Sequence, residues 1–107
     1  MSDPGRLKDR LLLEAPVELP DGSGGVTRGY ATTATVWAAL TPVASRGSVA
    51  ADAVAATVTH QIVIRRGPEV TTRHRFRLGT RVFRVIAMRD DDPERRFLAI
   101  QAEERTD

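Results

Sequence analysis

Residues 73–88 read RHRFRLGTRVFRVIAM, and this stretch decides the fold class. In residues 73–78 arginine alternates with histidine or an apolar residue, which is the two-residue period of a β-strand. Gly79-Thr80 follows with glycine first, as a type II′ turn requires of its two central residues. Residues 81–88 are then rich in the β-branched and aromatic side chains that favour strands. The stretch therefore predicts a β-hairpin that turns at Gly79-Thr80.

Strand signals continue on both sides of this hairpin. Some segments alternate with period two, others are rich in threonine and valine, and prolines disfavour a long helix near the N-terminus. The further predicted strands are one that ends near Leu19 and those at residues 30–40, 54–65 and 96–102. Residues 7–14 on their own fit a helical turn or a strand. Six strands and frequent turns predict an all-β fold, a small single-domain β-barrel or sandwich with one long loop.

The long loop is predicted at Thr41–Ala53, where Pro42 and Gly47 interrupt the chain between two strands. We expect this loop to project from the barrel and to be cut first by proteases near Arg46. The alanine-rich residues 48–56 leave a short helix as an alternative. The single domain is expected to span residues 1–107, with shorter loops at Asp21–Gly25 and Asp90–Glu94 and a flexible tail at residues 103–107.

The bulk composition excludes several classes of protein. A chain of 107 residues is long enough for one core, and 41% of its residues are hydrophobic. The absence of cysteine excludes disulfides and thiolate metal sites, which fits a reducing cytoplasm. No stretch approaches the roughly 18 apolar residues of a membrane span, and the N-terminus lacks the apolar region of a secretion signal. A soluble protein that is not secreted through a signal peptide is expected.

Catalytic and metal-binding patterns are also missing from the sequence. His60 and His74 are the only histidines, and His60 shares its strand face with Val58 and Ile62, which favours a hydrogen-bonded core or interface histidine. The acidic run Asp90–Glu94 lacks the ligand spacing of a calcium loop. We therefore predict a protein that is not an enzyme and that has no metal or other cofactor.

Trp37 is the only tryptophan and lies among apolar residues. Core packing is the first interpretation, and an anchor at a protein interface is the alternative. The predicted core consists of apolar residues on the period-two faces of successive strands: Val36, Trp37, Leu40, Val58, Ile62, Ile64, Phe76, Phe83, Val85, Phe97 and Ile100.

Fifteen of the sixteen basic side chains are arginine, and eight of them fall between residues 65 and 89 against one acid. The candidate interface or DNA-channel residues are Arg65, Arg66, Arg73, Arg75 and Arg77. Such a row forms either a solvated sheet face or a contact with nucleic acid phosphates or with acidic neighbouring subunits. The sequence leaves these alternatives open.

Several motifs, taken in order, resemble the head-to-tail joining family of siphophages and gene-transfer particles. The matching segments are Gly5-Arg6-Leu7 with Arg10, Gly24-Gly25, Thr35–Leu40 followed by Pro42, Thr59–Arg65, and Arg73 with Arg81–Ile86. Family members often carry a glutamate after that proline, whereas residues 44–48 here contain no acid. The resemblance covers residues 5–104.

The resemblance implies a β-barrel that assembles as a ring in the head-closure, or stopper, layer beneath the portal and adaptor. Its partners would be copies of itself, the portal or adaptor protein, a tail-terminator-type protein and packaged double-stranded DNA. The protein would reside in the bacterial cytoplasm during assembly and then in the neck of the particle. The alternative is a monomeric β-barrel that binds nucleic acid without sequence specificity.

Overall fold

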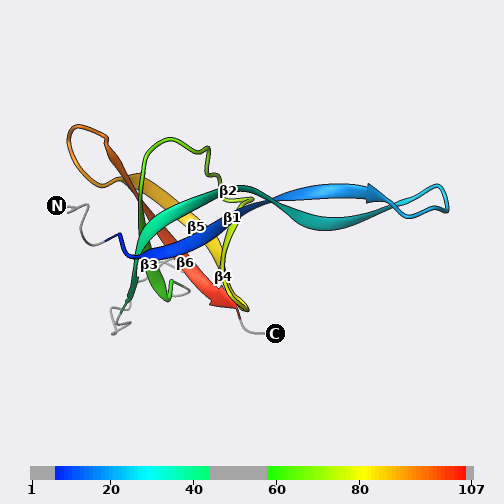
Figure 1. Ribbon diagram of the computed structural model, residues 1–107, viewed down its shortest axis with the longest axis horizontal. Helices are drawn as coiled ribbons and strands as arrows, with labels where there is room; N and C mark the ends of the chain where they lie inside the picture. Colours follow the sequence, from blue (N-terminus) through cyan, green and yellow to red (C-terminus); the bar gives the residue numbers. More distant parts are fainter. Residues whose placement is uncertain (1–6, 44–57, 106–107) are drawn as a thin grey trace, which may run out of the picture.

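The computed structural model describes residues 7–43 and 58–105. Six strands are present in this part of the chain: β1 (Asp9–Pro20), β2 (Val26–Pro42), β3 (His60–Arg65), β4 (Arg75–Leu78), β5 (Arg81–Asp90) and β6 (Phe97–Arg105). Neighbouring strands are antiparallel, and the order β1-β2-β3-β6-β5-β4 closes into a barrel through β1 and β4 (Figure 1). The described residues include no helix long and apolar enough to cross a bilayer. The all-β prediction is confirmed, with the barrel as its form.

The hairpin predicted at residues 73–88 is formed by β4 and β5. Leu78 pairs with Arg81, so Gly79 and Thr80 are the two central turn residues. Gly79 has a φ of 63°, the left-handed value that a type II′ turn needs at its first central residue and that glycine adopts without strain. Alternation and turn chemistry together were therefore sufficient to predict this hairpin.

Strands β3 and β6 differ in their limits from the prediction. β3 begins only at His60, after Val58 and Thr59, and residues 54–57 lie outside the described part of the chain. Residues 103–105 are the end of β6 and not the start of a flexible tail, because they pair with residues 82–84 of β5. The charged composition of this segment suggested a tail, but its backbone completes the ladder with β5.

The predicted projecting loop is described only at its start. Thr41 and Pro42 belong to β2, where Pro42 pairs with His60 of β3. Arg46, Gly47 and the alternative helix at residues 48–56 lie outside the described residues. The projection of this loop therefore stays a prediction.

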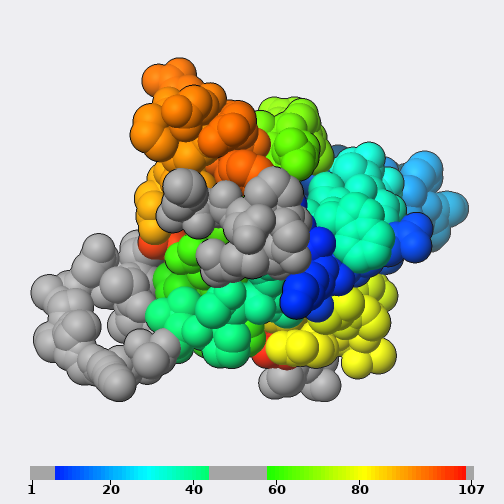
Figure 2. Space-filling view, turned by 60° about the vertical axis from the view of Figure 1, so that its left-hand side comes forward, coloured from blue at the N-terminus to red at the C-terminus, as the bar shows by residue number. Residues whose placement is uncertain are grey.

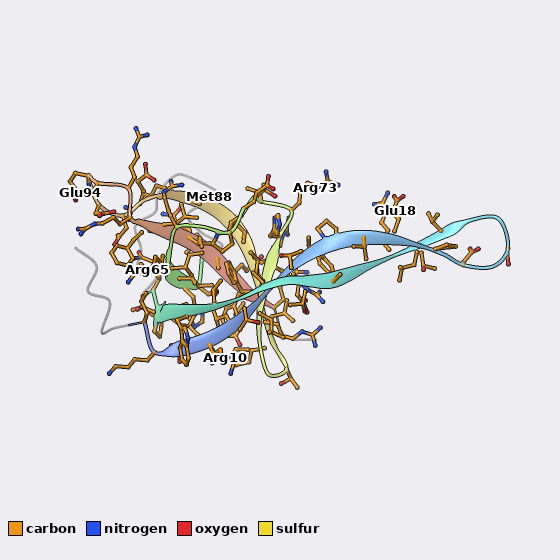
Figure 3. The ribbon with its side chains drawn as sticks, turned by 45° about the horizontal axis from the view of Figure 1, so that its top comes forward. Arg10, Glu18, Arg65, Arg73, Met88 and Glu94 are labelled. Carbon is orange, nitrogen blue, oxygen red and sulfur yellow. The ribbon has the colours of Figure 1, made fainter. Side chains whose placement is uncertain are left out.

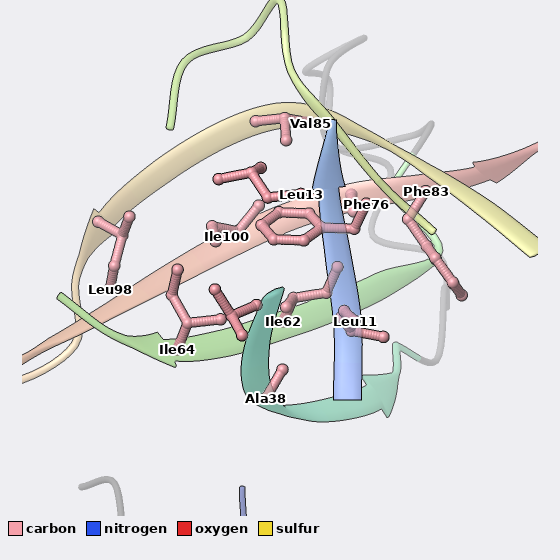
Figure 4. Close-up of a cluster of buried hydrophobic side chains, with 12 residues drawn as sticks. Leu11, Leu13, Ala38, Ile62, Ile64, Phe76, Phe83, Val85, Leu98 and Ile100 are labelled. Atoms are coloured by element: carbon pink, nitrogen blue, oxygen red, sulfur yellow. The ribbon is translucent and has the colours of Figure 1, made fainter. Parts of the chain in front are cut away.

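The barrel interior is filled by aliphatic side chains around two phenylalanines, Phe76 and Phe83 (Figure 4). This core cluster consists of Leu11, Leu13, Val36, Ala38, Ile62, Ile64, Phe76, Phe83, Val85, Leu98, Ile100 and Ala102. Leu40 is only partly buried against the cluster. Phe97 belongs to a second cluster with Ala39, Val63 and Ala99. Most of the predicted core is thus confirmed, while β1 contributes two leucines that were not predicted.

Trp37 is not a core residue: its exposed fraction is 57%. Its neighbours Val36 and Ala38 are buried in the barrel, and side chains alternate along a strand, so Trp37 points outward. The prediction of a core tryptophan is wrong because this part of β2 is apolar on both faces. Apolar composition alone does not show which of its residues point into the barrel. The alternative, an interface anchor, remains open.

The hairpin of β1 and β2 extends well beyond the barrel as an arm, which we define as residues 15–31 (Figure 1). β1 contacts β4 only through residues 12–14, and β2 contacts β3 only from residue 38 onward, so the strands of the arm pair only with each other. At its tip the Asp21 carboxylate accepts hydrogen bonds from the backbone N–H groups of Ser23 and Gly25. The predicted strand at residues 30–40 is therefore only part of a longer hairpin.

We expect Phe76→Ala to lower the free energy of unfolding by about 3–5 kcal/mol, because the ring is fully buried and the barrel cannot collapse around the cavity. Trp37→Ala is the matched aromatic control and should cost less than about 1 kcal/mol, since most of that ring is in solvent. Urea unfolding of both variants measures the difference. Equal losses would contradict the assignment of inside and outside.

Candidate functional site

A buried carboxylate lies where the barrel closes. β1 and β4 meet in a ladder of three residue pairs, of which Glu14 and Arg75 form one. The Glu14 side chain is only 7% exposed; its Oε1 accepts a hydrogen bond from Arg75 Nε at 2.6 Å, and its Oε2 lies 3.1 Å from Arg77 Nε. The Arg77 Nε–H makes no hydrogen bond among the described residues, so its contact with Glu14 is purely ionic. One acid thus holds two of the three predicted β4-region arginines against the barrel.

The Arg75 guanidinium is fixed from a second side by the arm. It lies over the Tyr30 ring, 3.7 Å from the ring centre, and Tyr30 pairs with Pro16 across the arm. A guanidinium stacked on an aromatic face and bonded to a carboxylate has few accessible positions. Arg75 therefore joins the base of the arm to the barrel wall.

A groove of about 560 Å³ opens beside this contact, between the arm and the outer surface of the barrel. Its lining residues are Pro16, Arg28, Gly29, Tyr30, Thr72, Arg73, His74, Arg75, Val82, Arg84 and Arg105. Five of these eleven residues are arginine and none is acidic. We call this feature the arginine groove.

The charges of the arginine groove are only partly balanced. Apart from Arg75, two of its arginines have acidic neighbours: Arg28 lies 3.9 Å from Glu18 in an exposed pair, and Arg105 lies 3.7 Å from Glu103. Arg73 and Arg84 form no ion pair with any described residue, and both are exposed. The groove therefore offers positive charge that the described chain does not neutralise.

The predicted set of five arginines is not one surface. Arg65 and Arg66 lie at the end of β3, away from the arm, where Arg66 pairs with Asp90 and Arg65 lies over the Phe97 ring. Arg73 lies at the root of the arm (Figure 3). Sequence proximity suggested one patch, but the turn between β3 and β4 separates the two groups.

The acidic loop between β5 and β6 is organised by its own residues. Asp92 accepts hydrogen bonds from the backbone N–H groups of Arg96 and Phe97 and from Arg96 Nε. Burial alone would raise the pKa of Asp92, but these hydrogen bonds outweigh it and lower the pKa. Asp90 pairs with Arg66 and Arg95. The loop projects from the barrel on the side away from the arm (Figure 2), and its negative charge is largely balanced locally.

His60, the first residue of β3, lies in a polar cluster. Its ring packs edge-on against Phe83, Nδ1 contacts the Thr59 hydroxyl at 3.0 Å, and Nε2 lies 3.8 Å from Glu104. Burial lowers the pKa of His60; Glu104 raises it and Arg81 lowers it, with a net decrease. Arg81 binds Glu104 through two nitrogen atoms, and these hydrogen bonds lower the pKa of Glu104. The arrangement is that of a packed histidine hydrogen-bonded to a hydroxyl, as expected for a structural residue.

No group of acidic or histidine side chains suited to a metal ion occurs among the described residues.

Residues 2–105 match the family model described as phage head completion protein. The chain belongs to the phage head completion protein family. The resemblance drawn from the sequence motifs is thereby confirmed.

Two solved structures are similar to this head completion protein. A chain of the virion of a native gene transfer agent particle has 31% sequence identity and a TM-score of 0.67, covering 94% of this chain and 96% of its own. The solution structure of protein SF1141 from Shigella flexneri 2a has 26% identity and a TM-score of 0.75, covering 96% of both chains. No curated protein matches this chain.

Several residues of the arginine groove were not anticipated from the sequence. Arg28, Tyr30, Arg84 and Arg105 come from three strands that meet only in the barrel. Glu14 did carry a signal, because an acid inside the apolar run LLLEAPV is rarely buried unless it is paired. Its partners in this head completion protein are more than sixty residues away along the chain, which no local pattern shows.

Glu14→Gln should lower the free energy of unfolding by about 1.5–3 kcal/mol, because two arginines lose their shared carboxylate at the barrel closure. Glu18→Gln is the matched control on the same strand and should change it by less than about 0.5 kcal/mol, since its pair with Arg28 is exposed. Urea unfolding at neutral pH compares the two. A similar loss in both variants would show that the closure does not depend on Glu14.

The lowered pKa of His60 predicts a pH dependence of stability. Below its ordinary value of 6.5, the unfolded chain takes up the proton before the folded chain, so the free energy of unfolding falls as the pH decreases. His60→Phe keeps an aromatic ring beside Phe83 and should remove this part of the pH dependence between about pH 7 and 5.5. The lowered pKa values of Asp92 and Glu104 also reduce the free energy of unfolding in acid, but this decrease begins at a lower pH. If the free energy of unfolding of the wild type and of His60→Phe changed equally with pH in this range, the lowered pKa of His60 would be contradicted.

Proposed function

We propose that this head completion protein is a ring-forming subunit at the head-to-tail junction of a tailed-phage-like particle, in the head-closure layer. There it would help to retain packaged double-stranded DNA and would present a docking surface to the tail. The observation that carries this proposal is the match over nearly the whole chain to a component of a gene transfer agent virion. The role is structural and needs neither catalysis nor a cofactor.

Two separate surfaces of the chain support assembly into a ring. A closed ring requires two different patches on each subunit, which meet head to tail. Trp37 exposes a large apolar ring on the barrel, while Leu19 and Val26 are more than half exposed on the arm. One face of the arm carries no charge at all, since it is formed by the pairs Ala15/Ala31, Val17/Gly29 and Leu19/Thr27. We infer that Trp37 is an interface anchor.

The arm in particular is difficult to explain in a monomer. An isolated two-stranded hairpin is at best marginally stable in water, and beyond residue 14 this one receives no third strand from the barrel. Its exposed apolar side chains would be covered if the arm lay against a neighbouring protein of the particle. Contacts with copies of the chain, with the portal or adaptor protein and with a tail-terminator-type protein are therefore proposed.

Within the particle, we propose that the arginines meet negative charge. Arg75 and Arg77 already share Glu14, so Arg73 is the least compensated of the three. Arg65 and Arg66 form a separate group that would meet a different neighbour or the DNA channel. The predicted projecting loop, with Arg46 and Gly47, would start after Pro42, the last residue of β2, and remains a proposed contact element. The protein would assemble in the bacterial cytoplasm and end in the particle neck.

A monomeric barrel that binds nucleic acid without sequence specificity is the second candidate, and the arginine groove is the observation that favours it. Native mass measurement with and without portal-complex proteins, together with DNA binding by the isolated chain, separates the two. A chain that stays monomeric with those proteins but binds DNA tightly would support this second candidate and contradict the first.

The proposed function predicts the effect of Trp37 variants on particle assembly. In cells that lack the native gene, the wild-type chain should restore DNA-filled, tailed particles, whereas Trp37→Ala should give a folded chain that is poorly incorporated. Trp37→Phe keeps an apolar ring and should restore most of the particles. Normal tailed particles without any copy of the chain would refute the proposed function. Normal particles with Trp37→Ala would refute only the anchor role.

A further inference from the structure

We propose that the arginine groove binds an extended acidic segment of another protein in the particle neck, through pairs between its arginines and the carboxylates of that segment. This inference rests on the proposed function, because it assigns a partner to one surface of the assembled subunit. The groove lies at the root of the arm, where Arg73 is found, and Glu18 lies further out on the arm (Figure 3). It is thus open to a neighbour that approaches along the arm.

Part of the binding geometry is already fixed in the free chain. Arg75 donates its Nε–H to Glu14 and stacks on Tyr30, so its plane is set while its terminal N–H groups have no acceptor among the described residues. A carboxylate can be bound by such a guanidinium through two parallel hydrogen bonds. Because the side chain is ordered before binding, less conformational entropy is lost on association.

The uncompensated charges lie beside this fixed arginine. Arg84 pairs with Arg75 across β4 and β5, and Arg73 precedes β4 on the same side of the groove. Glu14 already offsets the charge of Arg75, so the repulsion between these directly opposite residues is least compensated at Arg84. Its opposite residue on β6, Glu103, lies within ion-pair distance of Arg105 and not of Arg84. A ligand with several carboxylates along an extended chain would relieve this repulsion at successive positions.

The lining favours an acidic peptide over a nucleic acid duplex. Pro16, Tyr30 and Val82 give the groove apolar walls that can contact side chains but have no partner in a phosphate backbone. The phosphates of a duplex lie on the outside of a wide rod, whereas this groove is a recess of about 560 Å³ between the arm and the barrel. No aromatic series suited to stacking several bases lines it, since Tyr30 is its only tyrosine, tryptophan or phenylalanine.

The acidic loop of a second copy is a poorer occupant. Asp90 and Asp92 are already bonded to Arg66 and Arg96 within their own chain. That loop also carries Arg95, which would add positive charge to an already basic groove. The chemistry therefore indicates a different protein, one that supplies acidic residues without arginines among them.

The test is fluorescence anisotropy of the full chain with a short labelled peptide in which glutamates are interspersed with tyrosines. Arg73→Gln/Arg84→Gln should weaken binding roughly tenfold or more. Arg10→Gln/Arg89→Gln removes the same charge at exposed positions outside the groove and should change affinity less than about twofold. A peptide with glutamine in place of glutamate should not bind.

Three results would overturn the inference: no binding of the glutamate peptide, equal weakening by the two double variants, or tighter binding of a short duplex DNA to the same groove. The last result would identify nucleic acid as the partner. Incorporation of the chain into particles is measured separately. A chain that enters particles but binds no acidic peptide would refute this inference and leave the proposed function intact.

Discussion

The structure depends on the short ladder between β1 and β4. Only three residue pairs join these strands, yet without them the six strands would form an open sheet with two free edges. On the inner side Leu13 pairs with Phe76, and both are buried in the core. On the outer side Glu14 pairs with Arg75 and also contacts Arg77. Apolar packing and a buried ion pair thus close the barrel at the same point from its two faces.

This closure also determines where the candidate site lies. Because β4 is only four residues long, β1 continues past it and leaves the barrel as the arm. The recess between the departing arm and the turn before β4 is the arginine groove, and Arg75 belongs to both the closure and the groove. Binding of an anion there would therefore act directly on the contact that joins arm and barrel. If the groove binds such an anion, folding and recognition would share Arg75.

How much of this could be predicted from the sequence depends on whether the relevant information is local. The β4–β5 hairpin was predictable because alternation and Gly79 agree. Ile62, Ile64 and Ile100 were predicted as core residues by period two alone. The same rule failed for Trp37, because the apolar run around it leaves the phase of the strand undetermined.

The groove could not be predicted in the same way, because its residues are brought together only by the barrel. Arg28, Arg84 and Arg105 lie on three strands, and the partner of Glu14 is far away in sequence. The arm was missed for a related reason. The strand predicted to end near Leu19 does end there, at Pro20, but its prolines suggested an edge strand, and nothing local shows that residues 26–31 pair with it along its whole length. Motif order, by contrast, was sufficient to identify the family.

The central claim is that this chain forms a ring at the junction of head and tail. Electron cryo-microscopy of particles assembled with the chain tests it most directly. The account predicts a closed ring of this barrel between the portal complex and the tail, with Trp37 buried in a protein contact and density for another protein in the arginine groove. A particle whose neck lacks the chain, or in which the barrel occurs away from the head-to-tail junction, would contradict it.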